Sequence, residues 1–355
     1  MTRIRTDGQP GAFRRSPRHR TAIGLALVLG LGCGAVHAQL EACVAIQDDR
    51  QRLACYDAAA HRKYPDSPEA AAPDAGGQLL ERPVASAGAS ELEKRWELRP
   101  QLERGTFRLV PYRPIYALVH ATNHTHNRPS SPTRPFTAGD VDLNQVESKL
   151  QLSFKSKVLE NIGGSAADLW LAYTQQSFWQ AGNRGASSLF RETNYRPEAI
   201  LIQPLHMAFG GIRLRYAGLS LTHESNGRGE PLSRSWNRLI GELALESGPW
   251  ALHVRPWTRI ARRAGDRDDN PDIQDYVGRG ELVAVYRAAG NIVTLTGRHT
   301  LKGGNKSRGG ASVEWAFPIK GALNGHVQLS SGYGENLIDY NHRQTTLGFG
   351  VSFFD

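Results

Sequence analysis

The sequence predicts an all-β protein, a 12-stranded antiparallel transmembrane β-barrel preceded by a short helical N-terminal segment and a flexible linker. Three observations predict it: strand-length segments of alternating polarity, a consistently polar second face, and short turns that alternate with long loops. In the stretch 149–155, Leu150, Leu152 and Phe154 share one face, and lysine, glutamine and serine occupy the other. Because side chains of a strand alternate sides, such a segment separates an apolar from a wet environment.

Segments of this kind fill the chain from about residue 106 to residue 355, which we predict to be the barrel domain. Most are about 10 residues long, as a tilted strand needs to cross a bilayer. Short connections (246–249, 288–290) and long ones (182–195, 226–232) suit the two rims of an outer-membrane barrel. The segments lie near residues 107–121, 146–158, 167–179, 196–209, 211–225, 233–247, 249–261, 275–288, 291–300, 309–319, 324–334 and 343–354.

A secreted β-sandwich is the alternative that shares this periodicity. Its core between two sheets is dry, whereas the second face of these segments carries Lys, Gln, Glu and Arg, which suits a wide lumen. The C-terminal residues Phe353, Phe354 and Asp355 resemble the aromatic end of many outer-membrane barrels, although Asp355 follows the aromatic pair. These points favour the barrel.

Residues 1–38 read as a secretory signal peptide. Six arginines precede a short apolar run near 21–35, and Val36-His37-Ala38 supplies a small-x-Ala cleavage site, so we expect cleavage after Ala38. An uncleaved anchor is the alternative. The formal net charge is +9, and the signal accounts for +5 of it (six Arg, one Asp), which leaves about +4 and gives no argument for nucleic-acid binding.

Residues 39–62 are expected to form a small helical segment and residues 63–105 a linker, rich in Ala, Pro, Gly and Ser over its first part. Cys33 leaves with the signal, and it lacks the preceding leucine expected of a lipoprotein. Cys43 and Cys55 remain, and two nearby cysteines in an oxidising compartment usually form a disulfide. A free or metal-binding pair is the alternative, without a nearby His or third Cys to support it.

The hairpin around Glu230 carries the candidate chemistry. Leu219 and Leu221 mark the lipid-facing phase of its first strand, so His223 and Ser225 share that phase. Folded about Glu230, the hairpin sets His223 opposite Asn237, a register that a one-residue slip would destroy. Polar groups at one height of a lipid-facing wall are difficult to explain structurally, although His, Ser and Asn are common near loops.

Ser225, His223 and Asn237 can line up in that order. A serine hydroxyl becomes nucleophilic when a base takes its proton, and an imidazole does this near neutral pH. The base needs a group that orients it, and the carbonyl oxygen of Asn can replace the usual carboxylate. Without that carboxylate, a cation near the oxyanion would help, and calcium would serve.

The two halves of this hairpin, His223 to Arg228 and Ser233 to Arg238, resemble the signature of the outer-membrane phospholipase A family. The resemblance covers roughly residues 106–355. Further stretches that resemble the family are Tyr173-Thr174-Gln175-Gln176-Ser177, Phe190-Arg191-Glu192-Thr193-Asn194-Tyr195, Asp268-Asp269-Asn270-Pro271-Asp272 and Ser331-Gly332-Tyr333-Gly334-Glu335-Asn336-Leu337-Ile338-Asp339-Tyr340-Asn341.

The resemblance implies Ser225 as nucleophile, His223 as general base, Asn237 as its orienting partner and the Gly227 amide in the oxyanion hole. It implies a calcium-dependent homodimer that acts on membrane phospholipid. Calcium would be held by the Ser233 hydroxyl, the Arg228 carbonyl and Ser187 of the partner subunit. A second calcium site would use Asp269 and Glu230, where the family tends to have Asp; the longer Glu puts that site in doubt.

Gln175 shares parity with Leu169, Leu171 and Tyr173, so it should face lipid, where an unpaired amide is costly. A symmetric dimer would supply a second Gln175 as partner, and a bond to lipid headgroups is the alternative. The predicted function is a calcium-dependent phospholipase A of the outer membrane, with A1 and A2 activity and its active site near the extracellular face. A non-enzymatic porin or transport barrel and a soluble secreted esterase are the other classes.

Overall fold

A computed structural model describes residues 43–48, 51–53, 55–56, 88–185, 190–263 and 265–353. The signal-peptide prediction and most of the predicted linker lie outside these residues. The chain divides into two compact units, 1–76 and 77–355. In the first, Cys43 and Cys55 form a disulfide with a Cα–Cα distance of 5.6 Å. No helix among the described residues is long and apolar enough to cross a membrane.

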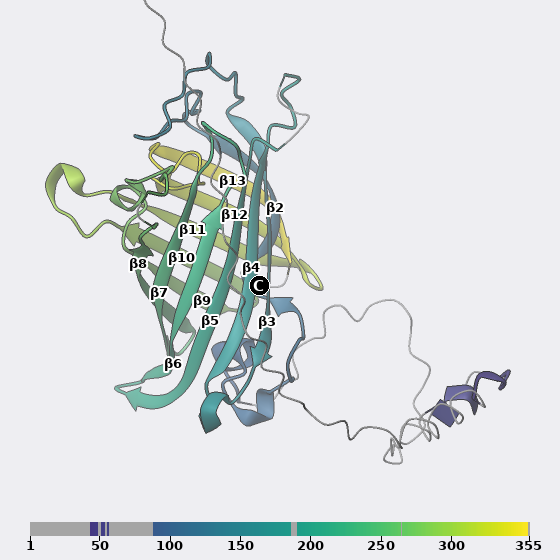
Figure 1. Cartoon of the computed structure of the whole chain (residues 1–355). Helices are drawn as coiled ribbons and strands as arrows, with labels where there is room; N and C mark the ends of the chain where they lie inside the picture. Colours follow the sequence, from purple (N-terminus) through teal and green to yellow (C-terminus); the bar gives the residue numbers. More distant parts are fainter. Residues whose placement is uncertain are drawn as a thin grey trace, which may run out of the picture. The chain divides into compact units, whose positions relative to one another are not determined.

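The second unit is a closed antiparallel β-barrel of twelve strands, β2 to β13, with a two-residue strand β1 paired to β3 (Figure 1). Each strand pairs with the next in sequence, and β13 pairs with β2, so the ring leaves no free edge. A closed ring satisfies the backbone groups that lipid cannot. The strands are β1 (Val110–Pro111), β2 (Ile115–Thr122), β3 (Val146–Leu159), β4 (Asp168–Trp179), β5 (Glu192–Phe209), β6 (Ile212–Ser225), β7 (Ser235–Ser247), β8 (Trp250–Ile260), β9 (Gly280–Ala288), β10 (Asn291–His299), β11 (Gly309–Lys320), β12 (Leu323–Gly332) and β13 (Gln344–Phe353).

The predicted strand count is confirmed, and most strand ends lie within a few residues of the predicted ones. The first segment differs most, because the strand is interrupted at Tyr112–Pro114, which separates β1 from β2. The two faces are as expected. Leu152 on β3 is 47% exposed, whereas its neighbours Gln151 and Ser153 point inward and are buried. An apolar outer wall around a polar interior is the outer-membrane arrangement.

Residues 88–105, expected within a linker, are instead ordered. They contain helix α3 (Glu91–Trp96) and the 3-10 turn η1 (Pro100–Leu102). Ser90 and Glu93 form a capping box at the start of α3, which stabilises a short helix. Trp96 packs against Trp170 and Tyr216 in a buried cluster, so this segment is part of the barrel's core. The Ala/Pro/Gly-rich composition that indicated a linker ends before Ser90.

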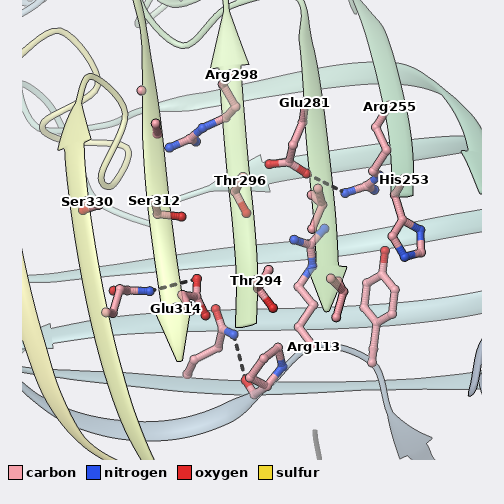
Figure 2. Close-up of a pocket in the computed structure, with 18 of the residues that line it drawn as sticks. Arg113, His253, Arg255, Glu281, Thr294, Thr296, Arg298, Ser312, Glu314 and Ser330 are labelled. Carbon is pink, nitrogen blue, oxygen red and sulfur yellow. Dashed lines mark hydrogen bonds and ion pairs between the residues drawn. The ribbon is translucent and has the colours of Figure 1, made fainter. Parts of the chain in front are cut away.

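The lumen is lined with ion pairs. Arg255 lies 3.2 Å from Glu198, 3.0 Å from Glu242 and 3.2 Å from Glu281. Arg255, Glu242 and Glu281 border a cavity of about 580 Å³ that Figure 2 shows, with Arg255 and Glu281 joined beside it. The α3 cluster and a second buried cluster that includes Trp236, Trp257 and Tyr340 also occupy the interior. These ion pairs and apolar clusters occupy much of the interior, which argues against the porin alternative.

Candidate active site

The β6–β7 hairpin has the predicted register. His223 is paired with Asn237, Leu221 with Leu239 and Ser225 with Ser235. Leu219 and Leu221 are 52% and 55% exposed, and the inward-pointing Thr222 between Leu221 and His223 is buried. His223 and Asn237 are exposed and Ser225 is half-buried, all on the outward phase. The lumen cavity is therefore separate from these three side chains.

One bond of the predicted triad is formed. His223 Nδ1 and Asn237 Oδ1 are 2.7 Å apart, so the imidazole donates from Nδ1 and its Nε2 is left as the basic nitrogen. Within the described part of the chain, Ser225 makes no side-chain hydrogen bond to this imidazole. Residues two apart on a strand have Cα atoms about 7 Å apart, and nucleophile–base contacts in substrate-free sites are often long. The three side chains are neighbours on one face.

The loop after Ser225 is held by Asn226, which the sequence analysis did not single out. Its buried side chain donates to Leu232 O at 2.9 Å, and its Oδ1 accepts from Arg234 N at 2.9 Å. Its backbone N–H also donates to Arg234 O at 3.1 Å. These bonds close the 226–234 loop and fix the backbone at Ser225, the last residue of β6, and at Gly227.

Gly227 occupies a position that favours glycine. Its φ is +63°, and a Cβ there would lie 3.2 Å from Tyr195 Cε2. Tyr195 is paired with Ser225 on the adjacent strand β5. A side chain at residue 227 would therefore strain the turn and press on the ring beside the serine. Tyr195 is a second residue that sequence reasoning missed, because only the β5–β6 register brings it here.

The first predicted calcium site has suitable oxygen donors. A single chain supplies only two of its three predicted ligands, because the third was expected from the partner subunit. Ser233 and Arg228 lie in the same loop, and hydroxyl and carbonyl oxygens are ligands that calcium prefers. Ser187 lies outside the described residues. Ser233 Oγ now donates to Asp269 Oδ2 at 2.6 Å. The described residues include no group of three or more His, Cys, Asp or Glu side chains that could hold a metal.

In the second predicted calcium site, the Arg134 side chain lies between the two carboxylates that were expected to bind the ion. Asp269 and Glu230 both pair with the guanidinium of Arg134, at 3.2 Å for Glu230. Glu230 also lies 3.2 Å from Arg267. A donor set with a guanidinium between its two carboxylates does not fit a calcium ion.

Gln175 lies on the outward phase of β4, but its amide already has partners. Its Oε1 accepts from the Tyr173 hydroxyl at 3.0 Å, and its Nε2 donates to Ser177 Oγ at 3.2 Å. The side-chain amide of Gln175 therefore has hydrogen-bond partners within one chain and does not need a second subunit to supply them. The parity of Gln175 remains compatible with a dimer but does not require one.

Charged groups anchor the loop after β12 near the site. Asp339 accepts from Arg191, at 3.0 Å, and from Asn336, at 2.8 Å, and its Oδ1 lies 3.1 Å from His126 Nδ1. Burial alone would raise the pKa of Asp339, but Arg191, His126 and Asn336 hold it well below its ordinary value. Arg191 O in turn accepts a bond from the Arg228 side chain. The loops at this rim thus form one network.

Fold and site together define a class: a transmembrane β-barrel of the outer-membrane type that carries its polar site on the outer wall. The family model for phospholipase A1 matches residues 92–353. The chain belongs to the phospholipase A1 family. The match begins at α3, earlier than the predicted boundary at residue 106, because this segment is part of the folded unit.

Related sequences and solved structures support the same family assignment. Phospholipase A1 of Salmonella typhimurium is 37% identical and covers 70% of this chain and 82% of its own length. The structure of outer membrane phospholipase A from Escherichia coli, 36% identical, covers 70% of this chain and 99% of its own, with a TM-score of 0.63. The Salmonella typhi outer membrane phospholipase dimer with bound calcium, also 36% identical, covers 73% and 95%, with a TM-score of 0.64. The chain is an outer-membrane barrel of this family.

Proposed function

We propose that this protein hydrolyses acyl esters of glycerophospholipids with Ser225, His223 and Asn237 as its catalytic triad. The observation that carries the proposal is the 2.7 Å bond between His223 and Asn237 on the lipid-facing phase, beside Ser225. A lipid acyl chain that lies along the wall would bring its ester to this height. Both A1 and A2 positions, and lysophospholipids, are within the proposed substrate range.

The chemistry follows from the hydrogen bond at Nδ1. Ser225 Oγ attacks the ester carbonyl carbon while its proton passes to His223 Nε2. Asn237 keeps the imidazole in that tautomer, and the Gly227 N–H donates to the oxyanion. Collapse breaks the bond to the glycerol oxygen, which takes the proton from His223 and leaves as lysophospholipid. Water, deprotonated by His223, then attacks the acyl-enzyme carbonyl. The bond to Ser225 Oγ breaks, Oγ takes the proton back from His223, and the fatty acid is released.

Calcium bound at the first site would add positive charge near the oxyanion, where the Asn of this triad leaves the imidazolium less stabilised than a carboxylate would. The Ser233 hydroxyl and the Arg228 carbonyl would hold it, with Ser187 of the partner subunit. A calcium-dependent homodimer is therefore part of the proposal. The related Salmonella typhi enzyme is described as a dimer with bound calcium, which supports it.

The test is fatty-acid release from phospholipid in mixed micelles, with calcium or with chelator. The Ser225→Ala variant should release none, and the parent should release fatty acid only with calcium. Ser235→Ala is the matched control, because Ser235 is paired with Ser225 across the hairpin but bonds to Arg262. Equal rates for Ser225→Ala and the parent would end the triad assignment. A rate unaffected by chelator would end the calcium assignment alone.

A further inference from the structure

The loop between β2 and β3 sends one arginine into the predicted second calcium site. Arg134 is 6% exposed, and its guanidinium pairs with Asp269 and, at 3.2 Å, with Glu230. Asp269 comes from the β8–β9 connection and Glu230 from the β6–β7 loop beside Ser225. One cationic side chain therefore joins three loops that are distant in sequence.

Arg134 is the last residue of a tight turn that fixes its backbone. Ser131 and Arg134 exchange backbone hydrogen bonds of 3.1 Å across Pro132 and Thr133, and proline favours such a turn. The same turn is tied to the loop that holds Asp269, because Ser131 Oγ donates to Asp269 O at 2.5 Å and Thr133 Oγ1 donates to Asp268 O. These hydrogen bonds fix the backbone of the turn, and so they fix the position from which the Arg134 guanidinium reaches Asp269.

Both oxygens of the Asp269 carboxylate are engaged. Oδ1 accepts from Arg134, and Oδ2 accepts from Ser233, the proposed ligand of the first calcium site. A contact path runs from Arg134 through Asp269 to Ser233. Anything that neutralises and fixes Asp269 also fixes the Ser233 hydroxyl, two residues before the strand partner of Ser225.

We propose that Arg134 replaces the second calcium ion in this chain. The guanidinium balances Asp269 and Glu230 and joins their loops, which is what a divalent cation between the same carboxylates would do. A calcium ion entering beside a buried guanidinium would meet like-charge repulsion that the low-dielectric setting strengthens. Arg134 is a positioning residue: it acts on the site through Asp269 and Ser233. The inference rests on the proposed function in one respect: the resemblance to a calcium-dependent family is the reason to expect a cation between Asp269 and Glu230.

The test measures stability and calcium binding in detergent micelles without substrate or dimerising additives, so it is independent of catalysis. The unfolding midpoint of the parent should be the same with millimolar calcium and with chelator. Arg134→Gln should unfold earlier in chelator and regain roughly 5 °C with calcium, as ligand binding to a newly opened carboxylate site would give. Calorimetric titration should show one more calcium per subunit than in the parent.

Two variants sharpen this test. Arg134→Lys keeps the charge and should stay insensitive to calcium, whereas Asp269→Asn added to Arg134→Gln should abolish the gained response. Arg267→Gln is the matched control, because Arg267 also contacts Glu230 but its side chain is 69% exposed. A parent that is stabilised by calcium, with the effect lost in Asp269→Asn, would overturn the proposal even if Arg134→Gln did not fold. So would Arg134→Gln that binds no additional calcium.

Discussion

The outer wall at the β6–β7 hairpin and the lumen behind it carry the same kinds of polar residue in opposite settings. In the lumen, Arg255 contacts the buried carboxylates of Glu198 and Glu242 and the partly buried carboxylate of Glu281. On the wall, His223 and Asn237 are exposed and bonded to each other, with Ser225 beside them. The difference indicates that exposure towards lipid, rather than polarity, separates the proposed catalytic groups from the polar groups of the lumen. Variants on the two sides should therefore fail in different ways.

The largest effect is expected from His223→Ala. Removal of the proposed general base should lower the rate of fatty-acid release on the order of 10⁴-fold, because nucleophile and base act as a unit. The unfolding midpoint should hardly change. His206→Ala is the control, since His206 is an exposed histidine on β5 outside the hairpin. Substantial activity in His223→Ala would remove the distinction between wall and lumen.

A smaller loss is expected from Asn237→Ala. Without its acceptor the imidazole loses orientation and tautomer, and the rate should fall on the order of 10²-fold, less than for loss of the base itself. Asn237→Asp restores an acceptor opposite Nδ1 and should recover most of the rate. If Asn237→Ala and Asn237→Asp were equally impaired, the 2.7 Å bond would have no orienting role.

In the lumen, Glu242→Gln should affect stability and leave the specific activity of folded protein unchanged. Loss of one charge beside buried Arg255 should lower the free energy of unfolding by about 3 kcal/mol, measured by urea unfolding in micelles. Glu160→Gln is the control, because that side chain is 36% exposed and 3.8 Å from Lys157. Loss of activity in Glu242→Gln without loss of stability would assign the lumen a catalytic role.

The smallest effect concerns pH and the rim loops. Because the pKa of folded Asp339 is well below the value of about 3.9 expected for the unfolded chain, its ionised form stabilises the native state at neutral pH. That contribution is lost as the pH falls below about 4 towards the folded pKa. Asp339→Asn should cost about 2 kcal/mol at pH 7 and show a weaker acid dependence of unfolding between pH 7 and 3. An unchanged pH profile would contradict this account.

Much of the barrel was predictable because its signal is local. Alternation of apolar and polar residues repeats along each strand, so both faces of β3 and β6 could be predicted from the chain alone. The hairpin register was predictable for the same reason, since a one-residue slip would turn either Leu221 or Leu239 into the lumen. The α3 segment was missed because its few apolar residues find their partners on strands far along the chain.

The order of the strands, their faces, and the alignment of Ser225, His223 and Asn237 follow from the amino-acid sequence, because each depends on periodicity within one strand or one hairpin. The position of Tyr195 beside Gly227 depended on the β5–β6 register, and the partners of Gln175 depended on how its side chain turns towards its neighbours on β4. Only the guanidinium of Arg134 between Asp269 and Glu230 depended on closure of the barrel. Closure brings separate hairpins and their loops to one rim, and a contact such as that of Arg134 with Asp269, 135 positions apart, leaves no periodic trace in the chain.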